Sequence, residues 1–244
     1  MSGAAIRGLF VTGTDTGVGK TLITAGLTHA LRVRGIDVGV MKPVETGCRA
    51  RNGRLRPPDA LTLREAAGSR DAMDLINPYR FREPLAPMVA AERSRRTIEV
   101  ERILERFGRL GDRHAMMLVE GAGGLLVPIT EKLSLLDLAA RLRLPLLVVV
   151  GSRLGALNHA RLTVEAALAA RVQVAGAIVN RATVERSPAQ ATNLSVLRRL
   201  LPIPVFGEIP HLSGISGDTL WRSPIVQRIL TPYLGDLFHE LIRR

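Results

Sequence analysis

The sequence has few aromatic residues, one cysteine and no long apolar run. Aromatic residues make up 3% of the 244 residues and hydrophobic residues 46%, so Leu, Val, Ile and Ala have to build the core. The single cysteine, Cys48, excludes an intramolecular disulfide. The longest apolar run, residues 144–150, is far shorter than the ~20 residues that cross a bilayer, and residues 1–8 lack the apolar stretch of a secretory signal. We therefore expect a soluble, cytoplasmic protein with no membrane partner.

Lysine is also scarce, although the formal net charge is +12. Lys20, Lys42 and Lys132 are the only lysines, so arginine carries almost all of the positive charge. A strongly basic chain can indicate nucleic-acid binding, but the arginines are scattered and form no long block. This distribution favours a solvated basic surface that partly serves acidic ligands, and we expect no nucleic-acid partner.

Short apolar runs alternate with segments of helical period. The runs predict strands at residues 8–12, 37–41, 115–120, 145–150, 174–179 and 204–207, and helical patterns lie at about 21–35, 59–67, 97–110, 135–142, 158–170 and 189–200. Continuous apolar strands joined by helices imply a mostly parallel sheet with helices on both faces. Without repeats or linkers, residues 1–244 are expected to form a single α/β domain. The segment 48–59, rich in Arg, Gly and Pro, is expected to be a mobile loop.

The segment FVTGTDTGVGKT, residues 10–21, resembles a phosphate-binding loop with one extra residue. The common pattern has four residues between the first glycine and Gly-Lys-Thr, whereas Gly13 and Gly19 are separated by five. A strand, a loop of small residues, Gly-Lys-Thr and a helix still follow in the required order. Backbone N–H groups and the helix dipole then favour an anion, with Lys20 at the outer phosphates of a nucleotide and Thr21 on Mg²⁺. A plain glycine turn is the alternative interpretation.

Polar residues also follow the other predicted strands, at the edge where parallel α/β sheets bind ligands. Lys42 follows the second strand, Asp59 begins a helix, and Glu120 ends a strand that glycines follow. The segments at residues 151–160 and 207–212 also follow strands. All of these segments are expected to converge on one crevice.

Together the segments resemble the dethiobiotin synthetase family. GTDTGVGKT, KPVETG, NPYRFREPLAP, VEGAGGLLVP, RLGALNH and GEIP occur in the family's order and at similar intervals, over nearly the whole chain up to about Leu212. The resemblance implies a P-loop fold, a homodimer and an enzyme that uses ATP and Mg²⁺. Its reaction converts 7,8-diaminononanoate and CO₂ to dethiobiotin through a carbamate and a carbamic-phosphoric anhydride.

The resemblance also assigns roles to residues. Lys42 and Lys20 are the expected catalytic residues, because positive charge keeps the substrate amine neutral and then stabilises the carbamate beside the γ-phosphate. Oxygens suit Mg²⁺, and the expected ligands are Thr21, Asp59 and Glu120. The expected nucleotide contacts are Gly17, Val18, Gly19, Lys20, Thr21, Leu22, Asp59, Glu120, Gly121, Ala122, Gly123, Asn180, Arg181, Pro210, His211 and Leu212. The expected substrate contacts are Thr16 and Thr46, with Gly155, Leu157 and Asn158 from the second subunit.

Three positions depart from the family pattern. Thr46 stands where many relatives have serine, which keeps the hydroxyl group. Gly17 stands where some relatives have glutamate, so a side-chain role is lost there. Arg181 stands where some have aspartate, and it could weaken selectivity among nucleotides.

Several residues allow a structural interpretation beside the chemical one. Cys48 is interpreted as a plain loop thiol rather than a nucleophile, and His159 as a packing or capping residue. Asp15 could contact the substrate or shape the loop. Asp59 could cap its helix as well as bind metal.

Two other functions are possible on this fold. A partition-type ATPase that binds DNA or partner proteins usually has an extra lysine early in the loop, where this chain has Asp15 and Thr16. A cobyrinate-type amide synthase also activates a carboxylate with ATP, but it needs an attached glutaminase domain that this chain is too short to hold.

Overall fold

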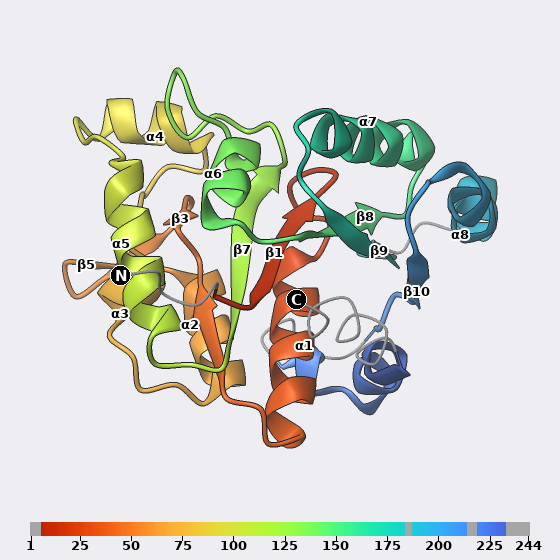
Figure 1. Ribbon diagram of the computed structural model, residues 1–244, viewed down its shortest axis with the longest axis horizontal. Helices are drawn as coiled ribbons and strands as arrows, with labels where there is room; N and C mark the ends of the chain where they lie inside the picture. Colours follow the sequence, from red (N-terminus) through yellow and green to blue (C-terminus); the bar gives the residue numbers. More distant parts are fainter. Residues whose placement is uncertain (1–5, 184–186, 214–218, 233–244) are drawn as a thin grey trace.

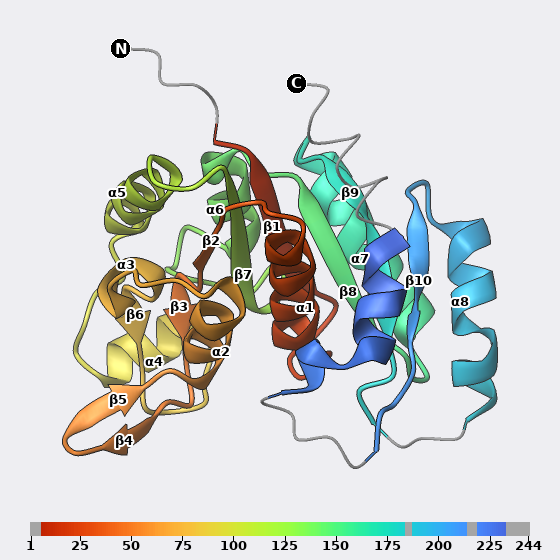
Figure 2. The ribbon, with the colours of Figure 1, turned by 90° about the horizontal axis from the view of Figure 1, so that it is seen from below.

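A six-stranded sheet forms the centre of the protein in the computed structural model, which describes residues 6–183, 187–213 and 219–232 (Figures 1 and 2). Its strand order is β10-β9-β8-β1-β7-β2, and every neighbouring pair is parallel. The strands are β1 (Gly8–Gly13), β2 (Val38–Met41), β7 (Met116–Gly124), β8 (Leu146–Gly151), β9 (Val174–Asn180) and β10 (Val205–Ile209). The predicted parallel α/β P-loop fold is therefore confirmed.

Helices cover both faces of the sheet, as strands that are apolar on both faces over most of their length require. On one face lie α1 (Lys20–Val33), α2 (Pro58–Ala67), the short η1 (Leu220–Arg222) and the helical residues 224–232. On the other lie α5 (Val100–Gly111), α6 (Leu135–Leu142), α7 (Ala156–Ala169) and, at the β10 edge, α8 (Pro188–Leu200). Within β1, Phe10 packs on the second face while Leu9 and Val11 pack on the first, which is the two-residue period of a strand.

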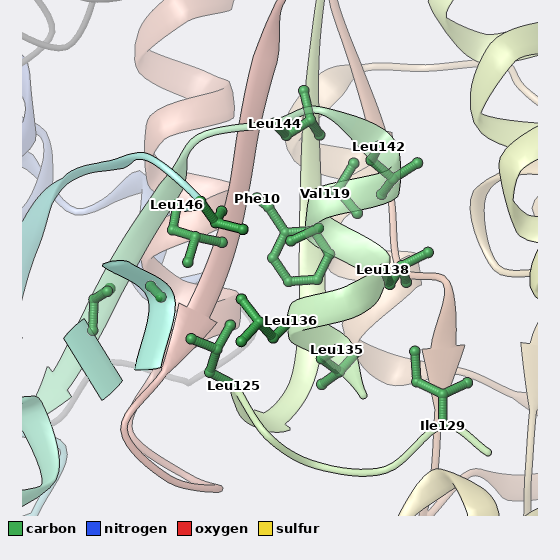
Figure 3. Packing of buried hydrophobic residues seen from close by; sticks show 14 of the residues in the cluster. Phe10, Val119, Leu125, Ile129, Leu135, Leu136, Leu138, Leu142, Leu144 and Leu146 are labelled. Atoms are coloured by element: carbon green, nitrogen blue, oxygen red, sulfur yellow. The ribbon is translucent and has the colours of Figure 1, made fainter. Parts of the chain in front are cut away.

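The core is aliphatic, as the shortage of aromatic residues predicts. Figure 3 shows the leucines of α6 lying against Phe10 of β1, Val119 of β7 and Leu146 of β8. The single tryptophan, Trp221, is 1% exposed and packs with α1 and α2. This packing holds the start of α1 at the carboxyl end of β1, where the loop of residues 13–19 lies.

Residues 48–59, expected to be a mobile loop, instead contain regular secondary structure. β4 (Arg49–Arg51) and β5 (Arg54–Arg56) pair as an antiparallel hairpin, and α2 already begins at Pro58. Asn52 and Gly53 join the strands with φ angles of 51° and 73°, which is the type I′ geometry that two-residue hairpin turns favour. The Asn-Gly dipeptide was the sequence signal for this turn.

A second small sheet lies beside the first and supports the site. β3 (Val44–Glu45) pairs in parallel with β6 (Tyr79–Arg80), and β6 follows the short helix α3 (Met73–Ile76) and precedes the short helix α4 (Pro87–Arg93) in the chain. None of these four elements was predicted, because segments of two to seven residues show no clear period. Among the described residues, no helix is both long and apolar enough to span a membrane.

Candidate active site

A cavity of about 510 Å³ lies beyond the carboxyl ends of β1, β2 and β7. This is the edge of a parallel sheet at which ligands bind. Elements far apart in the sequence meet there: the loop before α1, the β2–β3 segment, the start of α2, the segment before α4 and the end of β7. The lining residues are Thr16, Gly17, Gly19, Lys20, Thr21, Lys42, Glu45, Thr46, Asp59, Pro84, Leu85, Ala86, Pro87, Glu120, Ala122, Gly123 and Val127.

The loop between β1 and α1 has the geometry of an anion site. Gly19 is the N-cap of α1 with φ 93° and has no side-chain cap, so the N–H groups of the first turn are available to a ligand. A Cβ at Gly19 would lie 2.1 Å from Nδ2 of Asn180, so only glycine fits there. That Nδ2 donates to the carbonyl of Val18 at 2.8 Å, which ties the loop to the end of β9.

Lys20 lies inside this loop. Its Nζ donates to the carbonyl oxygen of Asp15 at 2.9 Å. Burial, with a smaller contribution from the charge of Lys42, lowers the pKa of Lys20 to about 8. An anion in the loop would oppose both effects and hold Lys20 in its charged form.

Lys42 lies between two carboxylates. Its Nζ is 2.6 Å from Oε1 of Glu120 and 2.8 Å from Oδ2 of Asp59, and it also donates to the carbonyl of Gly121 at 3.1 Å. Thr21 donates its hydroxyl to the same Glu120 oxygen at 2.8 Å. Lys42 is 3% exposed and Glu120 is fully buried, so water screens this cluster very little.

The pKa values of the cluster follow from burial and charge. Burial opposes the charged form of Lys42, but Glu120 and Asp59 outweigh it and raise the pKa of Lys42 above its usual value. Burial likewise opposes ionisation of Asp59, yet the charge and hydrogen bond of Lys42 hold the pKa of Asp59 below its usual value. For Glu120 burial dominates and raises the pKa. Lys42 is therefore a fixed cation rather than a proton acceptor.

The same cluster fits a divalent cation of the Mg²⁺ type. Oε2 of Glu120 is buried and has no hydrogen-bond partner among the described residues. The hydroxyl of Thr21 and the carboxylate of Asp59 line the same cavity, so three hard oxygen donors converge. The residues expected to bind Mg²⁺ are thus brought together, and their ligand role stays a prediction.

Glu45 is a charged residue of the cavity wall to which the sequence gave no role. Its two carboxylate oxygens accept from the backbone N–H groups of Asp59 at 2.9 Å and Ala60 at 3.0 Å. Burial and the neighbouring charge of Asp59 raise the pKa of Glu45 to about 7. Of the two interpretations of Asp59, the structure does not bear out helix capping by its side chain, because that carboxylate pairs with Lys42 and Glu45 caps α2 instead.

The expected substrate residues fall into two groups. Thr16 and Thr46 line the cavity. Gly155, Leu157 and Asn158 lie at the start of α7 and are not among the residues that line the cavity, so their role stays a prediction.

Most of the expected nucleotide residues lie around the loop. Ala122 and Gly123 border the cavity, whereas Leu22 is partly buried and packs against the core. The residues expected around the base lie at the ends of β9 and β10: Asn180, Arg181, Pro210, His211 and Leu212. Arg181 pairs with Glu208 at 2.6 Å and donates to the carbonyl of Gln190 at 3.2 Å, so its guanidinium is already engaged.

The structure shows the contacts of three residues for which the sequence allowed two interpretations. Cys48 is fully buried, and burial raises its pKa to about 12, which agrees with a plain thiol rather than a nucleophile. Asp15 shapes the loop, because its carboxylate pairs with Arg153 and its carbonyl accepts from Lys20. His159 is half-buried on α7, where its carbonyl accepts from Thr163.

Solved structures resemble this fold at low sequence identity. The septum site-determining protein MinD from Pyrococcus horikoshii, complexed with Mg-ADP, has a TM-score of 0.59 and 16% identity, with 96% of this chain and 95% of that chain covered. A ParA family ATPase from Chlorobium tepidum has a TM-score of 0.57 and 15% identity, with 94% and 98% covered. At such identities the likeness concerns the fold alone.

Sequence relatives are much closer. A family model described as an AAA domain matches residues 7–219. An ATP-dependent dethiobiotin synthetase from Thermodesulfovibrio yellowstonii is 37% identical over 226 residues, which cover 89% of this chain and 94% of that protein. One from Anaeromyxobacter dehalogenans is 46% identical over 195 residues, which cover 80% and 86%. With its phosphate-binding loop and the Lys42 cluster in place, the chain belongs to the dethiobiotin synthetase family.

Proposed function

We propose that this enzyme is a C–N bond-forming ligase of biotin biosynthesis, which makes dethiobiotin from 7,8-diaminononanoate, CO₂ and ATP with Mg²⁺. The observation that carries the proposal is the buried ammonium group of Lys42, held by Asp59 and Glu120 at the wall of a cavity that Lys20 and Thr21 also line. The named relatives support the reaction, and the cluster supports the steps below.

The first step forms a carbamate. One substrate amine attacks CO₂ in its neutral form; a C–N bond forms, the electron pair of one C=O π bond moves onto oxygen, and the nitrogen releases a proton to water, which leaves a negative carbamate. An alkyl amine has a pKa of about 10, and the fixed charge of Lys42 favours its neutral form. The same charge then stabilises the carbamate, and the hydroxyl of Thr46 on the cavity wall donates to it.

The second step brings two anions together. A carbamate oxygen attacks the γ-phosphorus of ATP, the bond to the β-phosphate oxygen breaks, and ADP leaves with the electron pair. Lys20, Lys42 and the N–H groups at the start of α1 oppose the repulsion between the anions. Thr21, Asp59 and Glu120 would hold Mg²⁺, which supplies further positive charge when it is bound.

The third step closes the ring. The second amine attacks the carbon of the carbamic-phosphoric anhydride, a C–N bond forms, the bond between that carbon and the bridging oxygen breaks, and inorganic phosphate leaves with the electron pair. Lys20 is suited to stabilise the leaving phosphate, because it lines the cavity beside the loop proposed to bind the phosphates. The amine releases its proton as the ring forms.

Further parts of the proposal concern the whole protein. We take residues 1–244 as one functional domain that works in the cytoplasm, with small molecules as partners. A homodimer would let Gly155, Leu157 and Asn158 of a second copy, at the start of α7, bind the carboxylate tail of the substrate. Nucleotide contacts at Asn180 and residues 210–212 also belong to this proposal.

The test is an ADP-release assay in which each component is omitted in turn. Purified protein should release ADP only with the diamine, bicarbonate, ATP and Mg²⁺ all present, and dethiobiotin should form in equal amount. ADP release that does not need the diamine, or an absence of dethiobiotin, would contradict the proposal.

A further inference from the structure

Glu45 is a buried carboxylate that the mechanism above does not use. It is 2% exposed at the cavity wall, and both of its oxygens accept from main-chain N–H groups of α2, those of Asp59 and Ala60. Asp59 in turn pairs with Lys42 and faces the same cavity. Glu45 thus holds the backbone of a residue whose side chain belongs to the cluster.

Glu45 satisfies every free donor at the start of α2. Pro57 and Pro58 have no N–H group. The first hydrogen bond within the helix is the one that the N–H of Leu61 donates to the carbonyl of Pro57 at 3.0 Å. Only Asp59 and Ala60 remain without a helical acceptor, and each donates to one oxygen of Glu45. When Glu45 is ionised, its negative charge also faces the positive end of the helix dipole.

The segment that carries Lys42 and Glu45 is itself fixed. The backbone N–H of Lys42 donates to the carbonyl of Ile76 at 2.8 Å, and Asn77 donates to the carbonyl of Lys42 at 2.7 Å. Phe81 donates its N–H to the carbonyl of Glu45 at 2.8 Å. Asp59 is therefore held twice from one rigid segment, by Lys42 at its side chain and by Glu45 at its main chain.

We propose that Glu45 is a positioning residue that fixes Asp59 for binding a divalent cation together with Thr21 and Glu120. Glu45 acts through the start of α2 and does not touch the substrate. The inference rests on the metal-dependent part of the proposed function. The inference is that Glu45, which is not itself a ligand, raises the affinity of the site for the cation.

The variant Glu45→Gln tests this inference. Glutamine has the same size, but its amide nitrogen cannot accept, so one N–H of α2 loses its partner. Loss of such an outer contact weakens metal binding by roughly 10- to 100-fold. The Mg²⁺ concentration for half-maximal activity should rise by that factor, while kcat at saturating Mg²⁺ should fall by less than about threefold.

A second measurement does not depend on activity. Mn²⁺ is titrated into the complex of the enzyme with ADP and followed by electron paramagnetic resonance, and its Kd should rise by the same factor. Glu65→Gln is the matched control, because Glu65 lies on the exposed side of α2, pairs with Arg222 and should leave both measurements unchanged. A fall in kcat with unchanged Mn²⁺ affinity would overturn the inference.

A double-mutant cycle tests whether Glu45 acts through Asp59. In an Asp59→Asn background, adding Glu45→Gln should shift the Kd of Mn²⁺ by less than about threefold, because the positioned carboxylate is already gone. Full additivity of the two effects would contradict the inference. If Glu45→Gln does not fold, Glu45→Asp keeps the charge but draws it back by one methylene group, and an unchanged Kd in that variant would also overturn it.

The two proposals fail separately. The Mn²⁺ titration needs neither the diamine nor CO₂. If the wild-type protein makes no dethiobiotin but Glu45→Gln still weakens the binding of Mn²⁺, the proposed reaction is wrong and the proposed role of Glu45 stands. If dethiobiotin forms and the Kd of Mn²⁺ does not change, the role of Glu45 is wrong and the reaction stands.

Discussion

The ammonium group of Lys42 lies 2.6 Å from the carboxylate of Glu120, although the two residues are 78 positions apart in the chain. They meet because β2 and β7 are neighbours in the sheet and end at the same edge. Both side chains are almost fully buried, so each needs the other to remain charged. The proposed site thus depends on an ion pair that the fold itself has to stabilise.

Replacement of Lys42 should separate catalysis from nucleotide binding. We expect Lys42→Met to lower dethiobiotin formation by at least about 100-fold, the cost of losing one preorganised charge, and to change the Kd of ATP by less than about tenfold. Lys132→Met is the control, because Lys132 is exposed and does not line the cavity. Turnover and isothermal titration calorimetry give the two quantities, and unchanged turnover would remove Lys42 from the mechanism.

The same variant should lower stability. Removing one partner of a buried ion pair costs about 3–5 kcal/mol, because the remaining charge has no partner. Urea unfolding of the protein without nucleotide should show a loss of this order. A loss below about 1 kcal/mol would mean that the Lys42 cluster is much more hydrated than its burial indicates.

Two glycines of the loop should respond differently to alanine. Both have positive φ, which costs a non-glycine residue about 1–2 kcal/mol. A Cβ at Gly17 would meet no heavy atom within 4 Å, whereas one at Gly19 would lie 2.1 Å from Asn180. We expect Gly19→Ala to weaken ATP binding at least about tenfold more than Gly17→Ala. Equal effects in calorimetric titrations would show that the contact with Asn180 does not shape the loop.

His114 should make stability depend on pH. Its ring nitrogens lie 3.0 Å from Asp37 and 2.8 Å from Asp71, and Arg113 also pairs with Asp71. Burial opposes the charge on His114, but hydrogen bonds to both carboxylates outweigh burial and raise its pKa above the ordinary value. The stabilisation is therefore complete below pH of about 6.5 and is lost as the pH rises through the folded pKa.

The variant His114→Gln tests whether the stabilisation by His114 decreases as the pH rises. Its free energy of unfolding should lie below that of the wild type by about 1 kcal/mol or less at pH 6, and the difference should shrink by pH 9. Urea unfolding at both pH values measures it. A difference that grows with pH would contradict the raised pKa.

The hairpin of β4 and β5 should gain stability from a charge reversal. Arg51 lies opposite Arg54, and Arg49 opposite Arg56, so like charges face one another. Arg51→Glu should stabilise the hairpin by about 0.2–1 kcal/mol, and adding Arg54→Glu should remove the gain because repulsion returns. Amide hydrogen exchange of residues 49–56 measures local opening, and the gain should shrink at high salt. Equal exchange in the two variants would exclude a cross-strand effect.

The six strands of the large sheet and their helices could be predicted from the sequence, because fully buried strands are apolar without interruption. Residues 145–150 were expected as a strand, and β8 spans Leu146–Gly151. The phosphate-binding loop could also be predicted from the sequence, since Gly13, Gly19 and Lys20 lie within a few residues of one another. A short segment of this kind carries its own geometry.

The small elements and the contacts of Glu45 could not be predicted in this way. β3 and β6 have two residues each, too few for any period, and they pair across more than thirty positions of the chain. Glu45 reaches Asp59 only because the intervening segment folds as a hairpin. The Asn52-Gly53 turn was visible in the sequence, but the position to which it returns the chain was not.

Chain chemistry alone therefore determined the parallel sheet and the place of the anion-binding loop, because apolar runs and glycine turns act over short distances. The charge states at the site were decided only when the fold brought β2, α2 and β7 together. The pKa of Lys20 falls to about 8 while that of Lys42 rises, although both are lysines at the same cavity. Burial and the nearest charges set these values, and both are properties of the packed molecule.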